Sequence, residues 1–334
     1  MRLAWANVRV SAVRTAMVAV PVIVLASGCS AGGSSGAMGS GSLTVAVVPG
    51  IESAPLSVAA QEGLFQQHGL DVTVKDYSSL SEEYQALASG QVQIAVGDYT
   101  DFFYEQATDH ASLRLIADGY DATANSMEIL TLPHSTVTTA QQLDDAGLVA
   151  TPPSALPATQ ATITTGLPYN IETLAADEVL QDDGVSTSTV SWEAMPEQNM
   201  ITALHDHQVG AILATEPYIL EAEEDLGAVE VADVSSGVTS GLPMDGYFSL
   251  ASYANANPAN VRAFQAALDQ AQADCAQRGP VQGVLPDLTG ITKDDAAMVT
   301  LGTYPTSLNV GQVQRVAALM YDAGMTSSEV VVNS

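Results

Sequence analysis

Short apolar runs rich in β-branched residues alternate along this chain with longer segments of helical periodicity. Most of the apolar runs have Gly, Pro, Asn, Asp or Ser, the residues that favour turns, directly before or after them. Ten runs predict strands, at residues 43–48, 70–77, 92–97, 113–119, 127–132, 147–151, 189–194, 210–215, 228–234 and 247–252. Strands that alternate with helices favour parallel sheets joined by crossover helices, so the pattern predicts an α/β fold.

The first of these units passes from a strand into a helix through an exposed turn. The strand "LTVAVV" is followed by Pro49, Gly50, Ile51 and Glu52, and a helical period starts directly afterwards. Ser53 is a candidate N-cap and Pro55 falls in the first turn, where its missing N–H costs nothing. Such a connection commonly places backbone N–H groups and loop side chains at the edge of a ligand crevice.

Two later segments are similar to each other. "ALASGQVQIAVGDYTD" (86–101) and "ALHDHQVGAILATEPY" (203–218) share Ala-Leu and then Gln-Val at the same spacing. Both read as the end of a helix, a tight turn, a strand and a polar loop that carries a carboxylate and a tyrosine. We interpret them as two copies of one unit, at similar depth in two sheets, which implies two similar lobes.

A family resemblance rests on the order and spacing of several short motifs. In the first part of the chain these are "APL" (54–56), "GLF" (63–65), "GLDV" (69–72) and "ALASGQV" (86–92). Later ones are "TEPY" (215–218), "GLPMDGYFSLAS" (241–252), "NPANVRAFQAALDQA" (257–271) and "ALMYDAGM" (318–325). With these motifs the chain resembles a type II periplasmic solute-binding protein, of the group that serves ABC importers of nitrate, sulfonates, taurine and the thiamine pyrimidine precursor.

The resemblance implies a two-lobed α/β protein with a ligand cleft. Each lobe would hold a mixed, mostly parallel sheet flanked by helices, and two crossovers would join the lobes. We expect lobe 1 at residues 43–128 plus 246–334 and lobe 2 at 129–245. The implied partners are a small-molecule ligand and an ABC transporter permease with its ATPase. No cofactor is expected.

Side chains that follow the ends of the predicted strands are the candidates for contact with the ligand. Asp98 stands out among them, because a charge directly after the apolar run "IAVG" is poorly placed for solubility alone. The tyrosines could equally pack the interface between the lobes, and the glutamates could be solvated turn residues. The candidates are Glu52, Ser53, Asp98, Tyr99, Tyr120, Trp192, Glu216, Tyr218, Asp245 and Tyr247.

Basic residues are missing from these predicted cleft loops. After residue 28 the chain carries only Lys75, Arg114, Arg262, Arg278, Lys293 and Arg315. Aromatic rings beside carboxylates suit a neutral or cationic nitrogenous ligand, such as a pyrimidine or an amine, through stacking and charge-assisted hydrogen bonds. Helix N-termini and neutral donors can also hold a sulfonate, taurine or nitrate anion, so that alternative stays open.

The overall charge narrows the possible partners further. Beyond residue 28 there are six basic residues against 38 acidic ones, a formal charge of −32. No basic surface is available to neutralise phosphates, so nucleic acid is not an expected partner.

The first 28 residues have the features of an export signal. Arg2, Arg9 and Arg14 precede the apolar stretch "AMVAVPVIVLASG", and small residues lead directly to Cys29. This resembles a bacterial lipoprotein signal, in which the cysteine receives the acyl chains (palmitate among them) and becomes the mature N-terminus. Residues 29–42 are rich in Gly and Ser and read as a flexible tether. We therefore expect a lipid-anchored protein at the extracytoplasmic face of the cell membrane.

An enzyme and a sensor lipoprotein are the alternative classes of protein. A pyrimidine-synthase-like enzyme would need a cysteine-rich segment and an iron-binding histidine, yet Cys275 is the only cysteine besides Cys29. His205 and His207 lie at a helix-to-strand turn, where side chains two residues apart diverge, and no metal site is expected there. A lipoprotein that feeds a sensor instead of an importer fits the sequence equally well.

Overall fold

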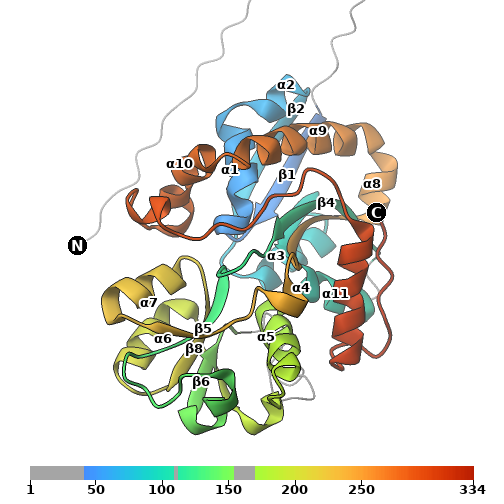
Figure 1. Ribbon diagram of the computed structural model, residues 1–334. Helices are drawn as coiled ribbons and strands as arrows, with labels where there is room; N and C mark the ends of the chain where they lie inside the picture. Colours follow the sequence, from blue (N-terminus) through green and yellow to red (C-terminus); the bar gives the residue numbers. More distant parts are fainter. Residues whose placement is uncertain (1–40, 109–111, 154–169) are drawn as a thin grey trace, which may run out of the picture. The chain divides into compact units, whose positions relative to one another are not determined.

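The computed structural model describes residues 41–108, 112–153 and 170–334. The predicted signal, the candidate lipidation site Cys29 and most of the tether lie outside the described residues. The fold contains two sheets of five strands each, in the orders β2-β1-β3-β10-β4 and β7-β6-β8-β5-β9. We call the elements around the first sheet the first lobe and those around the second sheet the second lobe (Figure 1).

All ten predicted strands are confirmed. They are β1 (Gly41–Val47), β2 (Leu70–Asp76), β3 (Ile94–Asp98), β4 (Leu113–Asp121), β5 (Met127–Thr131), β6 (Leu148–Thr151), β7 (Ser191–Ala194), β8 (Ala211–Thr215), β9 (Val229–Asp233) and β10 (Pro243–Leu250). The central strands β3 and β8 are almost wholly buried, which explains why they read as continuous apolar runs.

Helices cover both faces of each sheet. In the first lobe, η1 (Ile51–Ser53), α1 (Ala54–Gln61), α2 (Leu64–Gln67), α9 (Pro258–Cys275), α10 (Arg278–Thr289) and η5 (Asp295–Ala297) share one apolar core. The opposite face carries α3 (Leu80–Ala88), α4 (Tyr99–Thr108) and α11 (Val310–Asp322), and α8 (Ala251–Ala256) follows β10. In the second lobe, α6 (Glu197–His205) and α7 (Tyr218–Leu226) cover one face. The remaining elements are α5 (Ile171–Asp182), η2 (Ala140–Ala146), η3 (Thr187–Thr189) and η4 (Gly237–Thr239).

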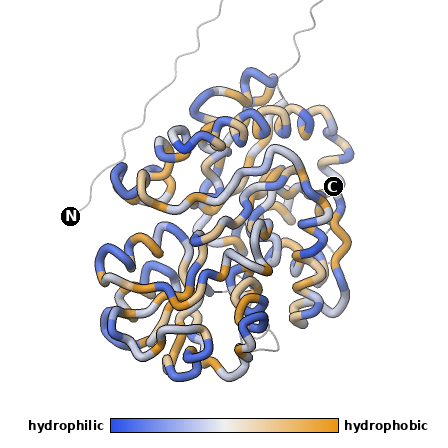
Figure 2. Tube along the Cα trace, viewed as in Figure 1, coloured by the Kyte–Doolittle hydropathy of each residue, from blue (hydrophilic) through white to orange (hydrophobic). Residues whose placement is uncertain are grey.

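Hydrophobic segments gather inside both lobes, and hydrophilic ones are frequent along the outer helices and turns (Figure 2). Within the described residues, none of the helices has both the length and the apolarity to cross a bilayer.

Each sheet has four strands that run in one direction and one that runs against them. In the first sheet β10 is antiparallel to both of its neighbours, and in the second sheet β5 is. These are the two strands that the crossovers deliver. Residues 122–126 lead into β5 and residues 234–242 lead into β10. The crossovers lie side by side, because Ser126 N donates to Ser235 Oγ (3.2 Å) and Val234 N to Met127 O (3.0 Å).

The two similar segments are confirmed as equivalent units. Strands β3 and β8 each hold the third, central place in their sheet. The turn before each strand is closed in the same way: Gln91 N donates to Ala86 O and Gln208 N to Ala203 O, both at 2.9 Å. The valine that follows is buried in both copies. The repeated Gln-Val therefore marks one helix–turn–strand unit that is used in both lobes.

Candidate functional site

A cavity of about 560 Å³ lies between the two lobes, and we call it the cleft cavity. The first lobe lines it with the segment after β1, the start of α4 and the start of β10. The second lobe contributes the segments after β6 and β8 and the first turns of α5 and α6. This is the place where the strand-end rule predicts a ligand site, and the volume suits a small molecule.

The cleft cavity is lined by seven carboxyl groups, and none of the described residues that line it is Lys, Arg or His. The sequence of residues 154–169 also contains no charged residue. Three of the seven come from the second lobe and four from the first. They are Glu52, Asp98, Asp101, Asp245, Glu172, Glu197 and Glu216.

Three of these carboxyl groups are held by protein donors. Asp98 Oδ1 accepts from Thr100 N (2.6 Å) and Thr100 Oγ1 (2.8 Å), which caps the start of α4. Glu197 Oε1 accepts from Thr215 N (3.2 Å) and Thr215 Oγ1 (2.8 Å). Glu216 Oε2 accepts from Leu220 N (3.2 Å).

Two of the held carboxyl groups also connect the lobes. Asp98 Oδ2, from the first lobe, accepts from Ile171 N at the start of α5 in the second lobe (3.1 Å). A carboxyl group of the second lobe does the same toward the first lobe: Glu216 Oε1 accepts from Thr300 N (2.6 Å). A helix N-terminus is the usual protein site for an anion, and here the protein's own Asp98 occupies the N-terminus of α5.

The other four carboxyl groups, those of Glu52, Asp101, Glu172 and Asp245, make no hydrogen bond to another side chain within the described residues. Asp101 is 6% exposed, and its Oδ1 is buried without a partner. The carboxyl group of Glu52 folds back over Gly50, where a Cβ would meet Glu52 Oε1 at 2.2 Å. The loop glycine therefore gives Glu52 the room to turn toward the cavity.

Burial and mutual repulsion raise the pKa values of these groups. Burial is the main cause for Glu52, whose pKa is raised to about 7. The pKa of Asp245 lies well above its ordinary range because of burial and then the charge of Glu52. For Glu172 and Asp101 the causes are burial and then the charge of Asp98, and both pKa values are again well above the ordinary range. Burial and repulsion therefore favour the protonated forms of these carboxyl groups over the ionised forms.

Five of the ten predicted site residues line the cleft cavity: Glu52, Asp98, Glu216, Tyr218 and Asp245. A sixth, Tyr120, lines a smaller adjoining cavity of about 70 Å³, which we call the inner cavity. The Tyr120 hydroxyl accepts from Gly302 N (2.6 Å).

The predictions that Tyr99 and Tyr247 contact the ligand need correction, because both side chains are fully buried and neither lines the cleft cavity. Tyr99 packs against Phe103 and Phe248, and its hydroxyl donates to Asp118. Tyr247 packs against Phe264 on the other side of the sheet. Their place is the core of the first lobe, so neither is in contact with the cleft.

The predictions that Ser53 and Trp192 contact the ligand need correction as well. The Ser53 hydroxyl donates to Gly50 O (2.8 Å) and accepts from Gly50 N (3.2 Å), so it closes the turn before α1 instead of capping that helix. Trp192 is half-buried on β7, and its Nε1 donates to Thr187 O (3.0 Å). Neither residue lines the cleft cavity.

Three cleft acids were missed at the sequence level: Asp101, Glu172 and Glu197. Each lies in the first turn of a helix, and that shared position is the signal that could have found them. Asp101 is three residues beyond Asp98. Glu193, next to Trp192 in the sequence, is exposed, whereas Glu197 in the following helix lines the cleft cavity.

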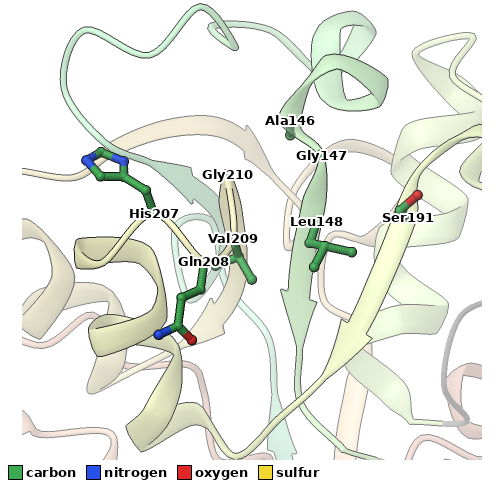
Figure 3. A pocket seen from close by; sticks show the side chains of 8 residues that line it. All are labelled: Ala146, Gly147, Leu148, Ser191, His207, Gln208, Val209 and Gly210. Carbon is green, nitrogen blue, oxygen red and sulfur yellow. The ribbon is translucent and has the colours of Figure 1, made fainter.

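A second hollow, of about 650 Å³, lies where β6, β7 and β8 of the second sheet begin, at the ends of these strands away from the cleft (Figure 3). Leu148 and Ser191 begin neighbouring strands there, and His207 and Gln208 lie on the turn before β8. His207 is the one titratable side chain in its lining, and it is exposed. His205 bonds its neighbour Asp206 (2.8 Å). The described residues contain no group of three or more His, Cys, Asp or Glu that could hold a metal ion.

Comparison with known proteins identifies the class of protein that has this fold and interlobe cleft. The model of the NMT1-like family matches residues 36–282, and this chain belongs to that family. No curated protein sequence matches the chain.

Solved structures with the same fold include binding proteins and an enzyme. The periplasmic aliphatic sulphonate binding protein SsuA from Escherichia coli is 16% identical, with a TM-score of 0.70 over 87% of this chain and 96% of that one. The periplasmic nitrate-binding protein NrtA from Synechocystis PCC 6803 is 13% identical, with a TM-score of 0.66 over 86% of this chain and 83% of that one. The desulfurization enzyme DSZB is 14% identical, with a TM-score of 0.63 over 87% of this chain and 95% of that one. The predicted two-lobed periplasmic-binding-protein fold is confirmed.

Proposed function

We propose that this protein is a lipid-anchored extracytoplasmic solute-binding protein that captures a small neutral or cationic nitrogenous molecule and delivers it to an ABC importer. One observation carries the choice of ligand: among the described residues, seven carboxyl groups and no basic side chain line the cleft cavity. An amine or a protonated ring nitrogen would gain charge-assisted hydrogen bonds to these groups. An anion would meet repulsion of several kcal/mol wherever carboxylates are close and shielded from water.

The alternative ligand is a sulfonate- or nitrate-type anion, because two of the similar structures are proteins named for binding such anions. The N-terminus of α5 argues against an anion, because the N–H of Ile171 already donates to the Asp98 carboxyl group. An incoming anion would have to displace Asp98 or bind among the remaining acids. A cationic or neutral ligand avoids both costs.

A thermal-shift screen tests the proposal. Sulfonates, taurine, nitrate, primary amines, pyrimidines and nucleobases would each be added to the domain from residue 41 onwards. A ligand at a hundredfold excess over its Kd stabilises the folded state by about 2.7 kcal/mol. We expect nitrogenous cations or neutral pyrimidines to raise the melting temperature. A shift produced by sulfonate or nitrate alone would show that the ligand class is wrong.

Affinity for a cationic ligand is expected to rise with pH. The pKa of Glu52 is raised to about 7, so its carboxyl group is largely protonated at lower pH and ionises as the cation binds. Each proton released makes Kd fall by up to about tenfold per pH unit below that pKa. Calorimetric titrations from about pH 6 to about pH 8 would measure this trend. A Kd that increases over that range would contradict it.

The lipid anchor yields a prediction about location. The proposal assigns the acyl chains to Cys29, from the small residues before it and the Gly/Ser tether after it. Replacing Cys29 by Ala is expected to release the protein from the membrane or to block its processing. Fractionation with immunoblotting would measure both forms. A processed Cys29→Ala protein that stayed on the membrane would disprove the anchor.

We also propose that the protein binds its ligand without transforming it. The only cysteine among the described residues, Cys275, is buried, and burial raises the pKa of its thiol to about 12, which leaves it a poor nucleophile. Because an enzyme shares this fold, the screened ligand would be incubated with the protein and examined by mass spectrometry. We expect the ligand to be recovered intact, and any product formed in proportion to the protein would refute the proposal. A permease–ATPase pair that is stimulated by the loaded protein would separate import from sensing.

A further inference from the structure

The four cleft acids that bond no other side chain among the described residues fall at two positions, and this division bears on the charge of the ligand. We propose that the ligand carries at least two protonated nitrogen centres, one held where the cleft cavity meets the inner cavity and the other held by Asp101. This inference rests on the proposed function of the cleft, which it makes more specific.

The first position is the junction of the two cavities. Glu52, Glu172 and Asp245 line both the cleft cavity and the inner cavity. Glu52 and Asp245 come from the first lobe and Glu172 from the second. A protonated nitrogen at this junction would be reached by acids of both lobes, so the positive charge would help to hold the lobes together.

The second position is the first turn of α4. Asp101 lines the cleft cavity and is absent from the lining of the inner cavity. Its carboxyl group is buried, and Oδ1 faces no donor within the described residues. The neighbouring donor Thr100 is already bound to Asp98, so among the described residues no donor reaches Asp101 Oδ1. A buried acceptor without a partner is costly, and a ligand donor would remove that cost.

One positive charge cannot satisfy both positions. A monocation bound at the junction would leave Asp101 buried and unpartnered, as it is in the empty protein. A linear diamine or a related dication would place one nitrogen at each position and its apolar stem along Ile51, Ile171 and the prolines of the lining.

Paired amines of equal carbon number test this inference. Wild-type protein at about pH 8 and low salt would be titrated calorimetrically with the linear diamines from 1,3-diaminopropane to 1,6-diaminohexane, each paired with the 1-aminoalkane of the same carbon number. We expect the best diamine to bind about tenfold more tightly than the monoamine, or better, because it adds a charge-assisted hydrogen bond. Asp101→Asn should remove most of that advantage, because it should weaken binding of the diamine more than binding of the monoamine. Asp71→Asn, which removes an exposed acid of the same lobe, is the matched control.

Glu172→Gln serves as a second variant if Asp101→Asn does not fold, and it should weaken the diamine and the monoamine together. Equal affinity of wild type for monoamine and diamine, or an Asp101→Asn variant that keeps the diamine advantage, would overturn the inference and leave the proposed function intact. Failure of every diamine to bind would overturn the inference as well. Binding of butane-1-sulfonate in place of all amines would overturn the proposed function itself.

Discussion

Replacing Glu83 by Ala is expected to lower the free energy of unfolding by about 2–5 kcal/mol, because it leaves one buried and one partly buried N–H group without an acceptor. Glu83 is fully buried on α3 beneath the cleft. Its Oε1 accepts from Val96 N (2.5 Å) on β3, and its Oε2 accepts from Val48 N (3.1 Å) directly after β1. Burial raises the pKa of Glu83 to about 8, so the side chain is itself costly to ionise, which offsets part of the loss.

The same variant should also weaken ligand binding, since Val48 begins the segment that carries Glu52. Urea unfolding monitored by circular dichroism would measure the stability. The neighbouring Glu82→Ala variant is the control, because Glu82 is exposed and its loss should change stability by less than about 0.5 kcal/mol. A Glu83→Ala protein as stable as wild type would show that the two hydrogen bonds contribute nothing.

The empty protein is expected to lose thermal stability as the pH rises from about 5 to about 8. Folding raises the pKa of Glu52 from 4.5 to about 7 and that of Glu83 from 4.5 to about 8. In this interval the folded chain binds more protons than the unfolded chain, so stability is fully present below pH 4.5 and is lost as these groups ionise. For a carboxyl group like that of Glu52 the loss is at most about 3 kcal/mol, and solvent screening reduces it.

Melting temperatures at constant ionic strength, measured without ligand, would test this pH dependence. Glu52→Gln should flatten the curve, because its side chain does not titrate. The exposed Glu193→Gln removes the same charge and should leave the slope as in wild type. A melting temperature that rises between about pH 5 and about pH 8 would contradict the account.

The strands were predictable from the sequence because a buried strand appears as a short run of apolar residues. The run at β3 carries no polar side chain from Ile94 to Gly97, since helices cover both faces of the sheet. The carboxyl side chains at strand ends, Asp98 and Glu216, were predictable for the same reason: a charge at the end of a buried strand must face an opening. The direction of β10 could not be predicted, because it depends on how the crossover enters the sheet.

The rest of the site depends on contacts that adjacent residues do not reveal. Tyr99 directly follows Asp98, yet the start of α4 turns its ring into the core while Asp98 faces the cleft. On β10, the pairing with β4 shifts register next to Asp245. The side chain of Asp245 therefore lines the cleft while that of Tyr247 lies in the core, although the two residues are only two positions apart. Glu172 lies far along the chain from the end of β6, and the return of α5 to the cleft brings it there.

The sign of one substitution effect tests the central claim that the cleft attracts positive charge. Asp245 lines both cavities, bonds no other side chain among the described residues and lies near Glu52, so Asp245→Asn changes charge with little change in shape. Wild type and Asp245→Asn would be titrated calorimetrically at about pH 8 with the ligand found by screening. For a cationic ligand the account predicts binding weakened by about tenfold, the usual loss for a charge-assisted hydrogen bond. Tighter binding by Asp245→Asn would mean that the wild-type acid repels the ligand, and it would contradict the account.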